Sequence, residues 1–155
     1  MGTDLIPTLY IAGSVVTIAA LARVGTDTQS SWYKALKKPE WQPPASLFAP
    51  VWFTIYLLLA ISAVLVWNET AGDVRTRLMI LFAINGVLNL AWSFIFFKGR
   101  SPLVAGIDIV ALAITILLIM VRIWPVSPVA SLLLLPYLVW VCFASVLNWA
   151  IARMN

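Results

Sequence analysis

The sequence predicts an all-α integral membrane protein, a bundle of five transmembrane helices with a long structured first loop. Of its 155 residues, 63% are hydrophobic and only 10% are charged, and the mean hydropathy is +0.99. These values lie outside the range of soluble domains. Five apolar segments are long enough to cross a bilayer, which takes about 17–25 helical residues. We therefore expect a single membrane domain over residues 1–155.

The predicted helices span, approximately, residues 5–22, 48–67, 78–97, 103–124 and 129–152. The fourth and fifth begin at Ser101–Pro102 and Ser127–Pro128, and a serine followed by proline is typical of an N-cap and the first helical position. Pro136 cannot donate the backbone hydrogen bond that would reach Leu132. We therefore expect a kink in the fifth helix.

The loop between the first two helices, residues 25–47, holds the one long polar stretch of the chain, WYKALKKPEWQPP at Trp32–Pro44. Its three prolines stiffen the backbone because each fixes φ. Its two tryptophans and one tyrosine argue against disorder. We expect this segment to form a folded lid over one end of the bundle.

Lysine and arginine are divided unequally between the two sides of the bundle. The side of the first loop and the C-terminus has Arg23, Lys34, Lys37, Lys38, Lys98, Arg100 and Arg153, and the opposite side has Arg75, Arg77 and Arg122. Positive residues favour the cytoplasmic side. The sequence therefore predicts that the long first loop and the C-terminus are cytoplasmic.

Polar and aromatic residues follow helical spacing along three of the spans, which places each set on one helix face. The sets are Trp52 and Tyr56; Asn85, Asn89, Trp92 and Phe96; and Tyr137, Trp140, Ala144 and Asn148. Most of them fall in the membrane half beneath the first loop, as does the acidic residue Asp108 in the fourth span. They predict a pocket under the lid, and indole and phenol faces suit a large, flat, hydrophobic ligand.

Each of these residues also has a structural interpretation. Asn and Tyr in membrane helices more often join helices by hydrogen bonds than bind ligands. Tryptophans at helix ends, as at Trp67, Trp124 and Trp149, are typical of anchors at the membrane interface. Asp108 could pair with a basic residue (Lys98 or Arg100), be protonated, or contact a ligand. The lid lysines could meet ligand carboxylates or face anionic lipid.

The sequence lacks the residues that several classes of chemistry require. Histidine, the commonest metal and haem ligand, is absent. There is also no metal-ligand cluster, no catalytic triad, no glycine-rich phosphate loop and no dense basic patch. The sequence therefore predicts no metal site, no resident cofactor and no nucleic-acid partner.

Five segments carry a resemblance to a known family. WYKALKKPEWQPP, APVWFTIY, LNLAWSFIFF, LVAGIDIV and LLPYLVWVCFASVLN occur in this order and together resemble the tryptophan-rich sensory protein family, which includes the mitochondrial translocator protein (peripheral benzodiazepine receptor). The resemblance covers all five helices and the first loop. It implies a five-helix bundle whose ligand pocket opens toward the cytosol and is capped by the first loop.

The resemblance also implies ligands and site residues. Family members bind porphyrins such as protoporphyrin IX, and synthetic isoquinoline carboxamide and benzodiazepine ligands. The ligand-binding positions that carry over are Tyr33, Trp41, Trp52, Asn89, Trp92, Tyr137, Trp140, Phe143 and Ala144. Polar support is expected from Tyr56, Asn85, Asp108 and Asn148, of which the last two match family landmarks.

The resemblance implies a membrane receptor or carrier for porphyrin as its ligand. Two alternatives stay open: a light- and oxygen-dependent porphyrin-degrading enzyme that uses Trp-assisted photo-oxidation, and a ligand-sensing stress regulator. For the enzyme no catalytic residue is firm, and the candidates are Trp52 and Trp140, whose indoles could take part in electron or radical transfer. Family members are commonly dimeric, so a homodimer is expected, which small residues such as Gly13 and Thr17 could support. The compact chain without a targeting extension resembles bacterial members. Trp149 stands where the cholesterol-recognition pattern has tyrosine, so cholesterol is not an expected ligand.

Overall fold

The computed structural model describes residues 5–155, so the first four residues of the predicted domain lie outside the described range. Within that range all regular secondary structure is helical. Five helical spans are long and apolar enough to cross a membrane, which confirms the predicted fold class. The spans are α1 (Leu5–Gly25), α3 (Ala45–Glu69), α4 with the π-helix η1 (Gly72–Ser93, Phe94–Lys98), α5 (Pro102–Ile123), and α6 with α7 (Pro128–Leu133, Leu135–Met154).

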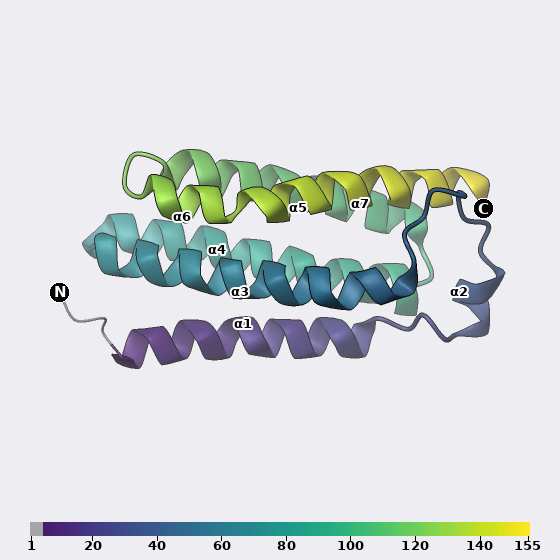
Figure 1. Ribbon diagram of the computed structural model, residues 1–155, viewed down its shortest axis with the longest axis horizontal. Coiled ribbons are helices and arrows are strands. Elements are labelled where there is room, and N and C mark those ends of the chain that lie inside the picture. Colours follow the sequence, from purple (N-terminus) through teal and green to yellow (C-terminus); the bar gives the residue numbers. More distant parts are fainter. Residues whose placement is uncertain (1–4) are drawn as a thin grey trace.

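The helices are arranged around a central pair, α3 and α4 (Figure 1). α1 packs against α3 and α4 on one side of that pair, and on the other side α5 packs closely against both α4 and α7. The short helix α2 (Ser31–Ala35) of the first loop lies at the same end of the bundle as the C-terminus. The lid therefore lies over the end of the bundle at which α3 and α5 begin and the spans of α4 and α7 end.

The third span begins at Gly72 rather than near residue 78. Hydropathy marks only the apolar part of a helix, whereas here the helix continues through polar first turns. Gly72 has a φ of +55°, which glycine adopts without strain, and Asp73 lies in the first turn, where a negative charge favours the helix dipole. The Arg75 guanidinium donates to the Thr70 carbonyl and lies 4.6 Å from the Trp67 ring centroid, so it joins the end of α3 to the start of α4.

The fifth span is broken at Leu134, between α6 and α7, as the position of Pro136 predicts. Neighbouring helices are hydrogen-bonded to the α6 region on both sides. The Ser62 hydroxyl donates to the Ala130 carbonyl at 2.8 Å, and the Ser131 hydroxyl donates to the Met120 carbonyl at 3.0 Å. These bonds fix α6 between α3 and α5, at the end of the bundle opposite the lid.

α4 continues into a π-helix, Phe94–Lys98, which the hydropathy pattern does not predict. Its wider turn is seen in the bond from the Gly99 N–H to the Phe94 carbonyl, five residues back, at 2.8 Å. Phe96 and Phe97 are adjacent in sequence, yet only 3% and 8% of their surfaces are exposed. Neighbours on an α-helix point about 100° apart. The π-helix and the lid together bury both rings.

α5 and α7 approach each other closely at Gly106. A Cβ atom at this position would lie 3.0 Å from both Asn148 Nδ2 and the Trp149 ring. The Trp149 indole therefore packs between helices, and its prediction as a simple interface anchor is incomplete. Trp124, in contrast, is 51% exposed at the end of α5, as expected for an anchor.

Candidate functional site

The lid is folded by its own hydrogen bonds. The Ser30 hydroxyl caps α2 by accepting from the Tyr33 N–H at 3.3 Å, and the Asp27 carboxylate accepts from the Ser30 N–H at 3.0 Å. The Lys38 ammonium donates to the Tyr33 carbonyl and lies 4.3 Å from the centroid of the Tyr33 ring. These contacts hold the chain in the compact form that its prolines and aromatic residues predict.

One group of rings joins the lid to the end of α4, and we call it the lid–α4 cluster: Trp32, Tyr33, Trp92, Phe96 and Phe97. Ring centroids lie 5.9 Å apart for Trp32 and Phe96, 5.3 Å for Tyr33 and Phe97, and 5.3 Å for the stacked pair Trp92 and Phe96. Separations of this size are typical of favourable aromatic pairs. Burial raises the pKa of the Tyr33 phenol above its usual 10, so the ring stays neutral at physiological pH.

A second group joins the lid to α3 and α7, and we call it the lid–α7 cluster: Trp41, Phe48, Trp140 and Phe143. The centroid separations are 5.9 Å for Trp41 and Phe143, 5.5 Å for Phe48 and Trp140, and 5.6 Å for Trp140 and Phe143. Within residues 5–155, Trp140 Nε1 of this cluster is buried without a hydrogen-bond partner. Gln42 Oε1 of the lid is also buried and unpartnered, while Gln42 Nε2 donates to the Tyr33 hydroxyl at 3.4 Å. Of the two unpartnered atoms, one is a donor and the other an acceptor.

Beneath the rings, a continuous chain of hydrogen bonds crosses the bundle. Tyr56 donates to Asn89 Oδ1 at 2.6 Å, and Asn89 Nδ2 donates to the Tyr137 hydroxyl at 3.1 Å. Tyr137 donates to Asn85 Oδ1 at 3.0 Å, and Asn85 Nδ2 donates to Thr115 Oγ1 at 2.9 Å. The two asparagines and two tyrosines of this hydrogen-bond chain therefore join helices, which is the structural interpretation given for such residues above. The Trp52 ring stacks on the Tyr56 ring of this chain, with 5.5 Å between the ring centroids.

Asn148 forms a second connection between helices. Its Oδ1 accepts from Trp92 Nε1 at 3.1 Å, and its Nδ2 donates to the Pro102 carbonyl at 2.7 Å. The residue is only 2% exposed. Asn148 thus ties α7 to α4 and to the first turn of α5, and it orients the Trp92 indole of the lid–α4 cluster.

Asp108 is half-buried on α5, and within the described residues it forms no ion pair. Its Oδ2 atom is buried without a hydrogen-bond partner. The two basic residues that the sequence offers as partners, Lys98 and Arg100, are both exposed. The structure therefore contradicts one of the alternatives for Asp108, the ion pair with Lys98 or Arg100.

The structure places the nine expected ligand-binding residues in three neighbouring settings. Tyr33 and Trp92 belong to the lid–α4 cluster. Trp41, Trp140 and Phe143 belong to the lid–α7 cluster, while Trp52, Asn89 and Tyr137 lie at the hydrogen-bond chain and Ala144 packs beside it against the core. All are at or beneath the lid end of the bundle.

Some residues of the two clusters, the lid and the hydrogen-bond chain were not predicted from the sequence. Phe48 lies one turn before Trp52, so helical spacing alone could have identified it. Trp32 and Gln42 lie within the lid segment that was singled out, but nothing in the segment distinguishes their side chains from its other members. Thr115 and Phe97 carry no signal of this kind, because their roles depend on a partner helix and on the π-helix.

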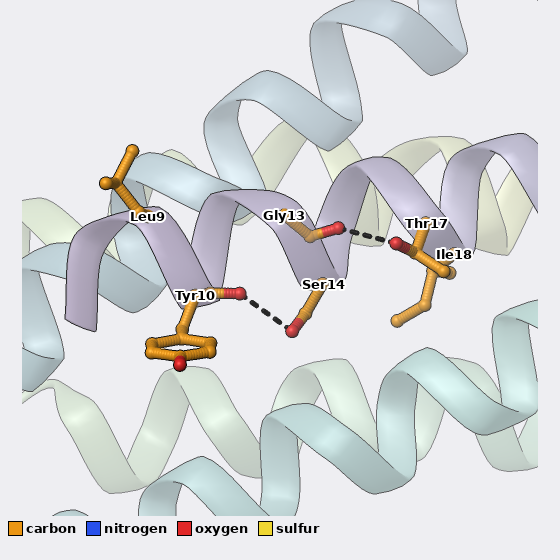
Figure 2. A pocket seen from close by; sticks show the side chains of 6 residues that line it. All are labelled: Leu9, Tyr10, Gly13, Ser14, Thr17 and Ile18. Atoms are coloured by element: carbon orange, nitrogen blue, oxygen red, sulfur yellow. Dashed lines mark hydrogen bonds between the residues drawn. The ribbon is translucent and has the colours of Figure 1, made fainter. Parts of the chain in front are cut away.

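A hollow of about 470 Å³ lies elsewhere, on the surface of α1 (Figure 2). It is lined by Leu9, Tyr10, Gly13, Ser14, Thr17 and Ile18. The Ser14 hydroxyl donates to the Tyr10 carbonyl and the Thr17 hydroxyl to the Gly13 carbonyl, each at 2.8 Å. Both hydroxyl donors are thus used within the helix, so the hollow presents mainly an apolar surface.

In the described part of the chain, no three His, Cys, Asp or Glu residues come together in a way that could hold a metal ion. The polar atoms among the two ring clusters and along the hydrogen-bond chain are instead amides, hydroxyls and indole N–H groups. Such a set can hydrogen-bond an organic ligand and stack against it, but it offers no anionic ligand set for a metal.

Comparisons of the sequence with known proteins identify its family. Residues 8–154 match the sequence model of the TspO/MBR family. The chain is 39% identical to Tryptophan-rich protein TspO of Chlorobaculum tepidum, over 100% of this chain and 99% of that protein. It is 37% identical to Tryptophan-rich protein TspO of Archaeoglobus fulgidus, over 95% and 97%, and 36% identical to Translocator protein of Homo sapiens, over 80% and 75%. The chain is therefore a multi-pass integral membrane protein that belongs to the TspO/MBR family.

Proposed function

We propose that the protein is a membrane receptor or carrier that binds porphyrins, such as protoporphyrin IX, and related flat hydrophobic ligands beneath the first loop. The observation that carries this proposal is the lid–α7 cluster, in which Trp41 of the loop meets Phe143 and Trp140 of α7. A ligand with two flat faces can replace these ring–ring contacts with ring–ligand contacts. The lid and the helices would then each cover one face.

Unpartnered polar atoms in the lid and in the lid–α7 cluster support a ligand with polar edges. The Trp140 indole donor and the Gln42 amide acceptor are both buried without a partner in the described chain, and such groups cost free energy unless something pairs with them. Asn89 and Tyr137, in contrast, are already bonded to each other. We therefore assign to the last two a positioning role, in which they hold Trp52 beneath the ligand.

A second candidate function is light- and oxygen-dependent breakdown of the bound porphyrin. It is favoured by two oxidisable rings in contact, Trp52 on Tyr56 at 5.5 Å, and by the indole of Trp140 within the lid–α7 cluster. Indoles beside an excited porphyrin can supply electrons to it. A titration in the dark followed by illumination separates the two candidate functions.

The proposal predicts that replacing Trp52 and Trp140 together by phenylalanine weakens protoporphyrin IX binding about tenfold. Phenylalanine offers a smaller ring face for stacking and has no N–H group to donate. The measurement is a titration in the dark of purified protein in detergent, followed by the absorption of the porphyrin. The matched control replaces Trp67 and Trp124, which end α3 and follow α5 at the opposite end of the bundle. It removes the same number of indoles and should leave the affinity unchanged.

Illumination of the same samples in air distinguishes carrier from enzyme. A stable porphyrin spectrum supports binding or transfer alone. Loss of the porphyrin bands in the wild type but not in the Trp52→Phe, Trp140→Phe variant would support the degrading enzyme. If wild-type protein gives no saturable titration in the dark, the porphyrin proposal fails.

A further inference from the structure

A second hollow, of about 260 Å³, lies at the lid end of the bundle, outside the lid–α7 cluster. Three elements meet around it: α2, the start of α5 and the end of α7. The lining residues are Trp32, Leu36, Arg100, Ser101, Pro102, Leu103, Ala152 and Asn155.

The walls of this hollow are fixed by hydrogen bonds and ring packing. Asn155 Oδ1 accepts from the Lys37 N–H at 2.9 Å, and its Nδ2 donates to the Lys37 carbonyl at 2.9 Å and to the Ile151 carbonyl at 2.8 Å. On the other side, the Trp32 ring packs edge-on against the buried Phe96 at 5.9 Å. The end of α7 and the lid are therefore clamped together, and the hollow is preformed.

Basic residues lie at the hollow and near it in the sequence. Arg100 lines it, and Lys37 is bonded through its backbone to Asn155. Lys98 and Arg153 are near neighbours in sequence of lining residues, and all four side chains are exposed. No acidic side chain lines the hollow, and within residues 5–155 none of the four basic groups has an ion-pair partner. The Asp27 carboxylate in the loop is engaged in accepting from the Gln29 and Ser30 N–H groups.

The depth of the hollow matches that of lipid head-groups. α5 enters its apolar span at Pro102 and α7 leaves its own at Met154, so the hollow lies where these two spans meet the membrane surface. Trp32 is the residue type that favours this interface. Leu103, 59% exposed beside the arginine, supplies an apolar surface on the bilayer side.

We propose that this hollow binds the head-group of an anionic phospholipid. Arg100 contacts the phosphate, for which the planar guanidinium fork is suited, while Trp32 and Leu103 pack against the glycerol and the upper acyl chain. Charge complementarity and depth together favour a lipid over a soluble anion. Because Trp32 belongs to the lid, a lipid in this position also holds the lid against α5 and α7. This inference does not depend on the identity of the ligand under the lid.

The test measures phosphatidylglycerol retained by the protein after reconstitution in phosphatidylcholine nanodiscs containing about one-fifth phosphatidylglycerol, by native mass spectrometry after mild detergent release. We expect the wild type to be enriched in phosphatidylglycerol over the bulk ratio. Arg100→Gln should reduce the retained phosphatidylglycerol about fivefold, whereas Arg100→Lys should retain most of it. The matched control is Arg122→Gln, an exposed arginine in the last turn of α5, at the end of the bundle opposite Arg100, which should behave as wild type.

A Leu103→Trp variant tests the same site without changing any charge, because the larger side chain fills the hollow. It should lose phosphatidylglycerol as Arg100→Gln does, and it keeps the test decisive if Arg100→Gln does not fold. The proposal is overturned if the wild type shows no enrichment, or if Arg100→Gln and Arg122→Gln lose lipid equally. Displacement of the bound lipid by soluble glycerol phosphate would also overturn it, since the site would then be one for a soluble anion.

Discussion

A Gly106→Val substitution is expected to destabilise the folded bundle by about 1–3 kcal/mol, the usual range for inserting atoms into a packed site. The added side chain would begin 3.0 Å from Asn148 Nδ2 and from the Trp149 ring. Displacing Asn148 would also break its bonds to Trp92 Nε1 and to the Pro102 carbonyl. The measurement is the thermal midpoint of the purified protein in detergent, followed by helical circular dichroism.

The matched control for this experiment is Gly13→Val on α1, where no atom lies within 4 Å of an added Cβ. Both changes put the same β-branched residue into a helix, so they share its intrinsic helix cost. The difference between their midpoints therefore reports the close approach of α5 and α7. Equal midpoints for the two variants would mean that the helices do not pack as closely as the structure shows.

The second large effect is expected from Tyr137→Phe, which removes one hydroxyl group and keeps the ring. The Asn89 amide would lose its acceptor and Asn85 Oδ1 would lose its donor. Hydrogen bonds between membrane helices contribute about 0.6 kcal/mol on average and at most about 1.7 kcal/mol, so the loss of two should destabilise the protein by about 1–2 kcal/mol. Trp52, whose ring meets Tyr137 edge-on at 6.3 Å, would keep that contact.

Tyr10→Phe on α1 makes the same chemical change at a residue that is 75% exposed and should leave stability unchanged. The proposed positioning role adds a second readout, the affinity for protoporphyrin IX. It should fall in Tyr137→Phe because the ring at position 137 still contacts Trp52 but is no longer anchored by its hydroxyl bonds. A Tyr137→Phe protein as stable as Tyr10→Phe would show that the hydrogen-bond chain contributes nothing to the fold.

Much of the candidate site could be located from the sequence. Helical spacing grouped Trp52 with Tyr56 and Tyr137 with Trp140, and the order of the spans placed these pairs beneath the first loop. Both pairs lie there in the structure. Which of these residues are available to a ligand could not be predicted, because an asparagine or tyrosine on an inward face can bond either to a neighbouring helix or to something bound between helices.

The apolar parts of the five spans, the break just before Pro136 and the stiff aromatic lid were determined by the sequence alone, because hydropathy, proline geometry and residue type act locally along the chain. The tertiary structure decided the rest. The pairing of Asn85 with Thr115, the close approach at Gly106 and the unpaired carboxylate of Asp108 depend on how each helix is rotated and how near its neighbours lie. Hydrophobic periodicity gives the inward face of a helix, but it does not specify the atom that the face will meet.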